Sequence, residues 1–188
     1  MASDRLPMIP ADQLTDEQRR AVAAFTAGRQ TPVFGPFTAL LRSPEVMLRA
    51  QAMGDHFRFH SSLPQALTEF TILVTARQWT QRFQWSYHCP LALAAGIRPE
   101  TVTSLAAGMR PEPMTDDEAL VYDFCTELER HHTVSDALYT RATARFGERG
   151  LIDLVGTVGY YTFQAMVLNT ARAAGPEGSA PDLPSLPW

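Results

Sequence analysis

The chain has 188 residues, of which 45% are hydrophobic and 19% are charged, and its formal net charge is −4. These values are typical of one soluble globular domain, and the negative charge argues against a nucleic-acid-binding protein, which usually presents a basic face. All 16 basic residues are arginines, which excludes a lysine Schiff base and a P-loop lysine.

Helical signals follow one another along the chain, with apolar residues at helical spacing. Thr15 and Gln18 have the spacing of a capping box, Ser43, Ser62 and Ser135 are the caps expected further on, and Gly28 is expected to end the first helix. Helices are predicted over residues 15–27, 45–59, 62–78, 81–95, 100–107, 115–129, 135–146 and 151–168. With no strand pattern and no repeat, the predicted fold class is all-α.

One helical domain is expected over residues 1–172, followed by a tail over 173–188 that is rich in proline and glycine and lacks regular structure. The first residues contain no apolar signal segment, which predicts a cytoplasmic protein. Asp153 and Gln164 interrupt the one long apolar run, 151–168, so a buried core helix is expected there rather than a membrane span.

The segment 67–96 contains the densest set of reactive side chains. Four residues at i, i+3, i+4 and i+7 share one face of its second helix, namely Gln81, Gln84, Trp85 and His88. A turn near Trp79 would make the two helices an antiparallel hairpin and bring Glu69 level with His88. The sequence therefore predicts that these two side chains face each other.

A carboxylate beside an imidazole fixes the imidazole tautomer and raises its basicity, so Glu69 and His88 form a candidate proton-transfer pair. Gln84 and Tyr87 are its expected hydrogen-bonding neighbours. Two structural alternatives remain open from the residues alone. In the first, Glu69 forms an ion pair with Arg77 or another arginine. In the second, His88 forms a hydrogen bond with a buried backbone carbonyl.

The segment 63–99 resembles the carboxymuconolactone decarboxylase-like family of the alkylhydroperoxidase D-like superfamily. Those proteins share a glutamate followed by a motif that ends in histidine, small residues and glycine. The matching positions here are Glu69, His88, Ala92 and Gly96. The resemblance extends to residues 36–44, 121–128 and 156–169, and it implies a helical bundle of the alkylhydroperoxidase D type.

The chain departs from the peroxidase branch of that superfamily, which has a CxxCxxxH motif. Gln81 and Gln84 stand at the two cysteine positions. A thiol-dependent peroxidase needs a thiolate and usually a resolving cysteine. Cys89, directly after the histidine, is expected to be a buried small residue. Peroxidase activity through Cys89 or Cys125 is therefore the alternative, and a non-catalytic helical module is a further one.

The resemblance implies a cofactor-independent lyase or isomerase that acts on a small carboxylated or lactone-like substrate. His88 would donate the proton with Glu69 as its partner, and Arg58 or Arg77 would anchor a carboxylate. The remaining substrate-binding candidates are Gln84, Trp85 and Tyr87. The resemblance also implies homo-oligomers, commonly trimers or hexamers, and no cofactor, nucleic acid or membrane partner is expected.

Histidines elsewhere suggest no metal site. His56 and His60 are four residues apart on one helix, but no third ligand follows at a suitable spacing. His131 and His132 are expected at a helix C-terminus, where they complement the helix dipole.

Overall fold

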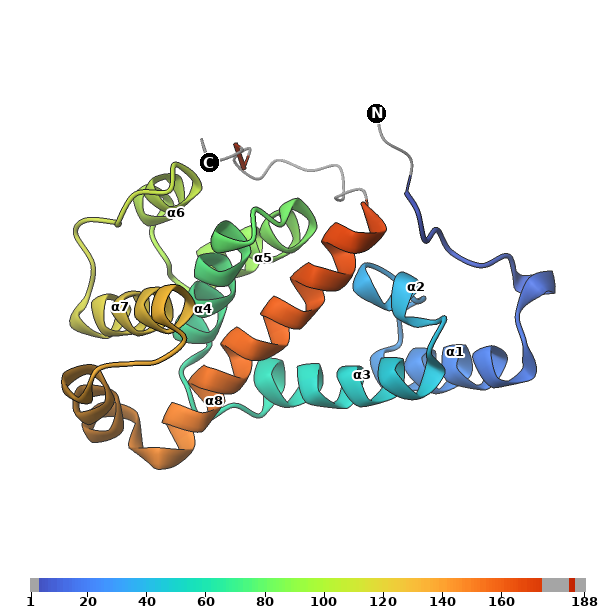
Figure 1. Ribbon diagram of the computed structural model, residues 1–188, viewed down its shortest axis with the longest axis horizontal. Helices are drawn as coiled ribbons and strands as arrows, with labels where there is room; N and C mark the ends of the chain where they lie inside the picture. The colour runs from blue at the N-terminus through green and yellow to red at the C-terminus, as the bar shows by residue number, and fades with distance from the viewer. Residues whose placement is uncertain (1–3, 174–182, 185–188) are drawn as a thin grey trace.

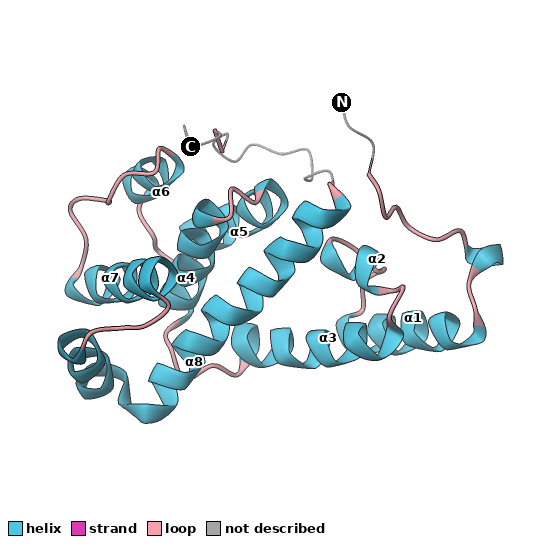
Figure 2. Ribbon diagram, in the orientation of Figure 1, coloured by secondary structure: helices cyan, strands magenta, loops and turns pink. Residues whose placement is uncertain are grey.

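A computed structural model of the chain describes residues 4–173, 183 and 184. Within these residues all regular structure is helical (Figures 1 and 2), which confirms the all-α fold class. The elements are a 3-10 turn Ala11–Gln13, α1 Asp16–Arg29, α2 Pro36–Leu40, α3 Pro44–Phe59, α4 Gln65–Gln78, α5 Arg82–Ala94, α6 Pro99–Ala106, α7 Asp116–His131 and α8 Asp136–Ala171.

The central helix is α4, in which every residue from Leu67 to Arg77 is buried. Helices α5, α6, α7 and α8 all pack against it. Two hydrophobic clusters result. One joins α4 to α5, α6, α7 and residues 138–158 of α8, and the other joins α1, α2, α3 and Ile72 of α4 to residues 160–167 of α8. Helix α8 therefore connects the two halves of the molecule (Figure 1).

Helix α8 contains 36 residues and is kinked at Gly147, whose φ of 69° and ψ of 172° are not helical. The kink separates the two helices predicted over 135–146 and 151–168. By length and composition α8 could cross a membrane, but 56% of its most apolar 18 residues are buried in the protein. Burial of this kind is typical of a core helix, as predicted.

Several helix boundaries differ from the predictions. The capping box of Thr15 is present, but α1 continues through Gly28 and ends where Gln30 adopts a left-handed φ of 54°. The Ser43 side chain makes no capping hydrogen bond. Ser62 does not cap α4 either, because its hydroxyl donates to Oδ2 of Asp153 at 2.6 Å and its backbone N–H donates to the same oxygen at 2.8 Å.

Helix α3 carries apolar residues on more than one face. Val46 and Met53 are 43% and 46% exposed, while Met47 and Gly54 are buried. Gly54 faces the core and packs closely against Tyr160, since a Cβ at this position would lie 2.3 Å from the Tyr160 hydroxyl oxygen. The short helix α2 was not predicted, because its five residues follow the breakers of the preceding loop.

The predicted tail lies outside the described residues except for Ala173, Leu183 and Pro184. Leu183 is 2% exposed and belongs to the α4 cluster. The carbonyl of Pro184 accepts a hydrogen bond from Arg77 at 2.8 Å. These two residues of the tail are therefore anchored to the domain.

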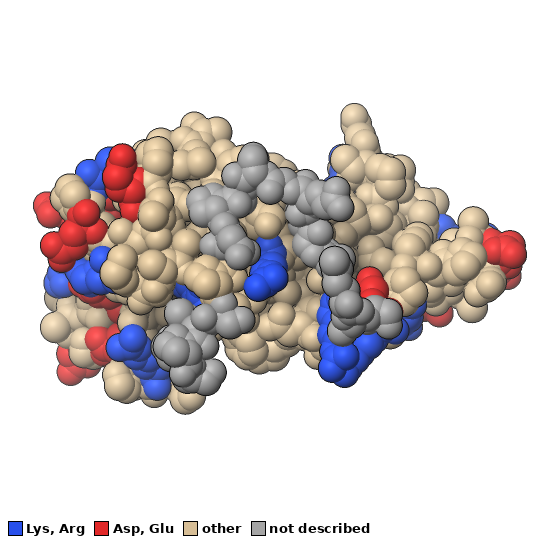
Figure 3. All heavy atoms as spheres, turned by 90° about the horizontal axis from the view of Figure 1, so that it is seen from above, with Lys and Arg blue, Asp and Glu red and all other residues tan. Residues whose placement is uncertain are grey.

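Charged side chains of both signs gather at the end of the molecule formed by α6 and α7 (Figure 3). Ion pairs contribute to this mixture, among them Arg145 with Asp117 at 2.6 Å and Arg110 with Asp123. Exposed pairs of this kind contribute at most about 1 kcal/mol each to stability.

Candidate acid–base site

Helices α4 and α5 form the predicted hairpin, which turns at Trp79–Gln81. The Gln81 side chain caps α5, because its Oε1 accepts from the backbone N–H of Phe83 at 2.6 Å and of Gln84 at 3.2 Å. Its Nε2 donates to Oδ1 of Asn169 on α8 at 2.9 Å. The residue at the first cysteine position of the peroxidase motif is therefore a helix cap that ties α5 to α8.

Glu69 and His88 face each other across the hairpin. Nδ1 of His88 lies 2.7 Å from Oε2 of Glu69, and the two residues are 5% and 2% exposed. The predicted juxtaposition is confirmed. The alternative in which Glu69 pairs with Arg77 is wrong, since Arg77 hydrogen-bonds to Thr80, Ala106 and Pro184.

The hydrogen bond defines the tautomer of His88. A carboxylate accepts, so Nδ1 carries the proton and Nε2 has the free lone pair. No described residue forms a hydrogen bond with Nε2. Burial lowers the pKa of His88 below its ordinary value of 6.5, Glu69 opposes this effect, and the charge of Arg58 adds to it. His88 is therefore a neutral base at neutral pH.

A small cavity of about 40 Å³ lies beside His88. Its lining comes from α1, α2, the segment before α2, α3, α5 and α8, and includes Arg29, Phe34, Arg58, Gln84, Tyr87, His88, Tyr161 and Gln164. An outer chamber of about 450 Å³ shares Arg29, Phe34, Arg58 and Tyr87 with it. The small cavity suits one functional group, and the chamber suits the rest of a small molecule.

Arg58 is the cation available to a ligand at this site. In the described part of the chain it has no carboxylate partner, and its buried Nε has no hydrogen-bond acceptor. Its guanidinium lies 5.0 Å from the ring centroid of Phe59 and 5.6 Å from that of Tyr87. Stacking of this kind positions a guanidinium while leaving its N–H groups free to bind an anion.

The second cation of the chamber, Arg29, is neutralised. Its Nη2 lies 2.7 Å from Oδ1 of Asp55, and its guanidinium is 4.7 Å from the Phe37 ring centroid. Sequence reasoning missed both Arg29 and Asp55, because no local motif marks them. Of the two arginines, Arg58 is the one left to bind a negatively charged group.

Gln84 lines the cavity as predicted. Its Nε2 donates to the backbone carbonyl of Tyr161 at 2.9 Å. A carbonyl only accepts, so this bond fixes the amide orientation and leaves the buried Oε1 without a partner. Tyr87 also lines the cavity, whereas Trp85 is 1% exposed and packs in the α4 cluster.

Tyr161 of α8 is buried and also borders the site. Its ring meets the imidazole of His88 edge-on, with 5.1 Å between centroids. Burial raises its pKa well above the ordinary value. The Tyr161 hydroxyl is therefore neutral at neutral pH.

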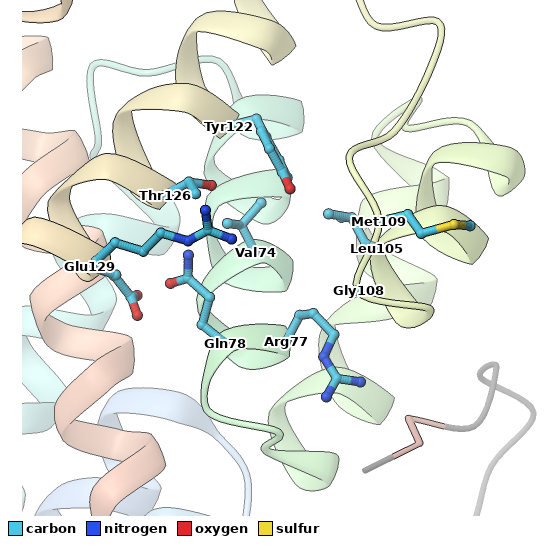
Figure 4. Close-up of a pocket in the computed structure, with 10 residues that line it drawn as sticks. Val74, Arg77, Gln78, Leu105, Gly108, Met109, Tyr122, Thr126 and Glu129 are labelled. Carbon is cyan, nitrogen blue, oxygen red and sulfur yellow. The ribbon is translucent and has the colours of Figure 1, made fainter. Parts of the chain in front are cut away.

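Arg77 lies away from this cavity. It lines a separate pocket of about 270 Å³ between α4, α6 and α7 (Figure 4). In that pocket burial raises the pKa of Glu129 to about 7. The structure therefore does not bring Arg77 together with Glu69 and His88, and of the two predicted anchoring arginines only Arg58 is at the site.

Both thiols are free and buried, and burial raises the pKa of Cys89 and of Cys125. Neither thiol is therefore a ready nucleophile.

His56 binds Oδ1 of Asp153 at 2.9 Å. In the part of the chain that the structure describes, no group of three or more potential ligands could hold a metal ion.

No protein-family model and no curated protein matches the sequence. Solved structures match the fold, two of them over 92% of this chain and 92% of theirs. One is an uncharacterized peroxidase-related protein from Silicibacter sp. TM1040, with 14% identity and a TM-score of 0.71. The other, from Ralstonia eutropha JMP134, has 13% identity and a TM-score of 0.73, and is described as an alkylhydroperoxidase AhpD core and an uncharacterized peroxidase-related protein.

Fold and site together define a helical protein with a buried histidine–glutamate pair. The fold is that of the alkylhydroperoxidase AhpD core, as the sequence resemblance implied.

Proposed function

We propose that the protein is a cofactor-independent lyase or isomerase that transfers a proton on a small carboxylated or lactone-like substrate. The observation that supports this most is the 2.7 Å hydrogen bond between Nδ1 of His88 and Glu69. It leaves Nε2 as a base beside a cavity that Arg58 also lines. Acid–base catalysis needs this combination of a neutral imidazole and a fixed orientation.

The arrangement supports one sequence of steps for isomerisation. Nε2 of His88 removes a proton from a carbon next to a carbonyl, and the electron pair of the C–H bond moves into the carbonyl to form an enolate. Glu69 stabilises the imidazolium, and Arg58 stabilises the negative charge of the substrate. The imidazolium then returns the proton to another carbon.

Decarboxylation uses the same groups with His88 in its protonated form. The C–C bond to the carboxylate breaks, CO2 leaves, and the electron pair enters a conjugated carbonyl. The imidazolium protonates the resulting enolate. The lowered pKa of His88 favours the neutral form, so proton abstraction is the first reaction to test.

Solvent hydrogen exchange tests this function without knowledge of the natural substrate. A panel of small keto acids, unsaturated lactones and muconate-like acids is incubated with the protein in D2O, and deuterium at carbon is followed by NMR. Exchange should be accelerated by the native protein and reduced about 10²–10⁴-fold by His88→Gln. His131→Gln, at an exposed helix end, is the matched control.

An exchange rate that His88→Gln leaves unchanged would remove the assignment. Peroxide reduction is tested in parallel with a Cys89→Ala, Cys125→Ala double variant, because both thiols are buried and inaccessible to alkylating reagents in the folded protein. Peroxidase activity that the double variant lacks would favour the thiol-dependent alternative. Binding of panel compounds without any exchange or turnover would favour the non-catalytic module.

A further inference from the structure

The second half of α8 has an outward face without polar side chains. Its exposed residues between positions 152 and 168 are Ile152, Val155, Gly159, Phe163 and Met166, which we call the α8 stripe. Ile152 is 66% exposed and Met166 is 47% exposed. In Figure 1 no other helix lies in front of α8.

Helical spacing places the whole α8 stripe on one face, because intervals of three and four residues follow the turn of an α-helix. The opposite face is buried against the rest of the protein. The solvent face of a surface helix normally carries charged and polar residues. An outward face that is apolar over four turns therefore indicates a surface that another molecule covers.

The spacing of the α8 stripe is symmetric about Gly159. Its successive residues are three, four, four and three positions apart, so the spacing is the same when counted from either end. Suppose that a second copy packs antiparallel, so that the Gly159 residues of the two copies face each other. Ile152 then meets the partner's Met166, and Val155 meets the partner's Phe163. A two-fold interface requires such a self-complementary patch.

The glycine at position 159 independently supports a contact at this surface. A glycine inside a helix costs about 1 kcal/mol relative to alanine. A Cβ at this position would have no neighbour within 4 Å, so nothing in the described chain requires a glycine here. A missing side chain does allow two helix backbones to approach closely where they cross.

We propose that the α8 stripe is the centre of a homodimer interface in which two α8 helices cross antiparallel at Gly159. Typical interfaces bury about 800 Å² on each partner. The half-buried residues beside the stripe, Gly156, Thr162 and Val167, are uncharged and extend the contact. The interface goes beyond the proposed function and does not depend on it.

The first experiment measures mass in solution by light scattering and sedimentation over a range of concentrations. The native chain should be a dimer or an even-numbered assembly. Gly159→Glu places two like charges at the two-fold axis and should weaken dimerisation more than about a hundredfold. Because the monomer has open space at this position, the variant should keep its helix content. Val46→Glu, which changes an exposed apolar residue of α3, is the control and should stay dimeric.

Cysteine cross-linking then tests the antiparallel register. Gly159→Cys should form an interchain disulfide under mild oxidation, since position 159 meets itself. Ile152→Cys alone should not, because two copies of position 152 would lie about 21 Å apart at 1.5 Å per residue. Adding Met166→Cys to that variant should restore the cross-link. Cys89 and Cys125 are buried and do not interfere.

A native chain that is monomeric at every concentration would overturn the proposal. An assembly that survives Gly159→Glu, or one that Gly159→Cys fails to cross-link, would place the contact elsewhere and also overturn it. A monomer that sediments with phospholipid vesicles through the α8 stripe would assign the surface to a lipid instead.

Discussion

Replacing Glu69 by Gln tests the central pair without any substrate. The substitution keeps the shape of the side chain but removes the carboxylate that accepts from His88 Nδ1 at 2.7 Å. Because both residues are buried, water does not replace the carboxylate, and the glutamine oxygen accepts at most a neutral hydrogen bond. A hydrogen bond to a charged group contributes about 1.5–3 kcal/mol and a neutral one about 0.5–1.5 kcal/mol, so the free energy of unfolding at pH 7 should fall by about 1–2 kcal/mol. Glu100→Gln on the exposed surface of α6 should change it by less than about 0.5 kcal/mol.

The imidazole gives a second measurement, by NMR titration of labelled histidine. Glu69 raises the pKa of His88 against the larger effect of burial. Without the carboxylate, the pKa should therefore fall further below 6.5. The native protein should show Nδ1 protonated, whereas the variant loses this preference, because a glutamine amide can either donate or accept.

The pH dependence of stability follows from the same shift. The folded state holds His88 neutral, so the unfolded state takes up a proton first as the pH falls below 6.5. The contribution of His88 to stability is therefore full above pH 6.5 and decreases as the pH falls from 6.5 toward its lowered folded pKa. His88→Gln should flatten the stability curve in that range. If Glu69→Gln leaves the His88 pKa and the unfolding free energy unchanged, the hydrogen bond does not control the imidazole, and the reasoning fails.

Three further predictions concern the framework around the site. Glu129 has a pKa of about 7 in the folded protein against 4.5 ordinarily, so stability should decrease as the pH rises from 4.5 to about 7. In denaturant titrations at pH 8, Glu129→Gln should remove this loss and stabilise the protein by about 1–2 kcal/mol, a value reduced because the side chain is partly exposed. Gly54→Ala places a Cβ 2.3 Å from the Tyr160 hydroxyl oxygen and should cost about 1–3 kcal/mol, and adding Tyr160→Phe should restore part of the loss in a thermal melt. Gln81→Ala removes the α5 cap and should cost about 0.5–2 kcal/mol, whereas Gln81→Asn, another capping residue, should retain most of that stability; equal stability of the two variants would contradict a capping role.

The sequence predicted the features that depend on short-range order. The hairpin and the facing of Glu69 and His88 follow from two helices joined by a short turn, because helix periodicity and turn length determine which residues lie level. The cap at Thr15 was predicted for the same reason.

Features set by tertiary packing were not predicted. Two apolar stripes compete on α3, and only the position of Tyr160 shows that the Gly54 face is inside. Arg29 reaches the outer chamber from α1, far from the hairpin in sequence. Arg77 looked equivalent to Arg58, yet it lies eight residues beyond Glu69 on α4 and hydrogen-bonds to Ala106 of α6 and Pro184 of the tail.

The two glutamines at the cysteine positions bear most directly on the chemistry. Gln81 bonds to Asn169 and Gln84 bonds to the carbonyl of Tyr161, so both hold the first turn of α5 against α8. A thiol pair must move between reduced and disulfide geometries, whereas these amides fix the helix in one position. A fixed helix keeps the His88 ring oriented toward Glu69, which proton transfer requires. The same substitutions that remove the redox motif therefore support an acid–base site.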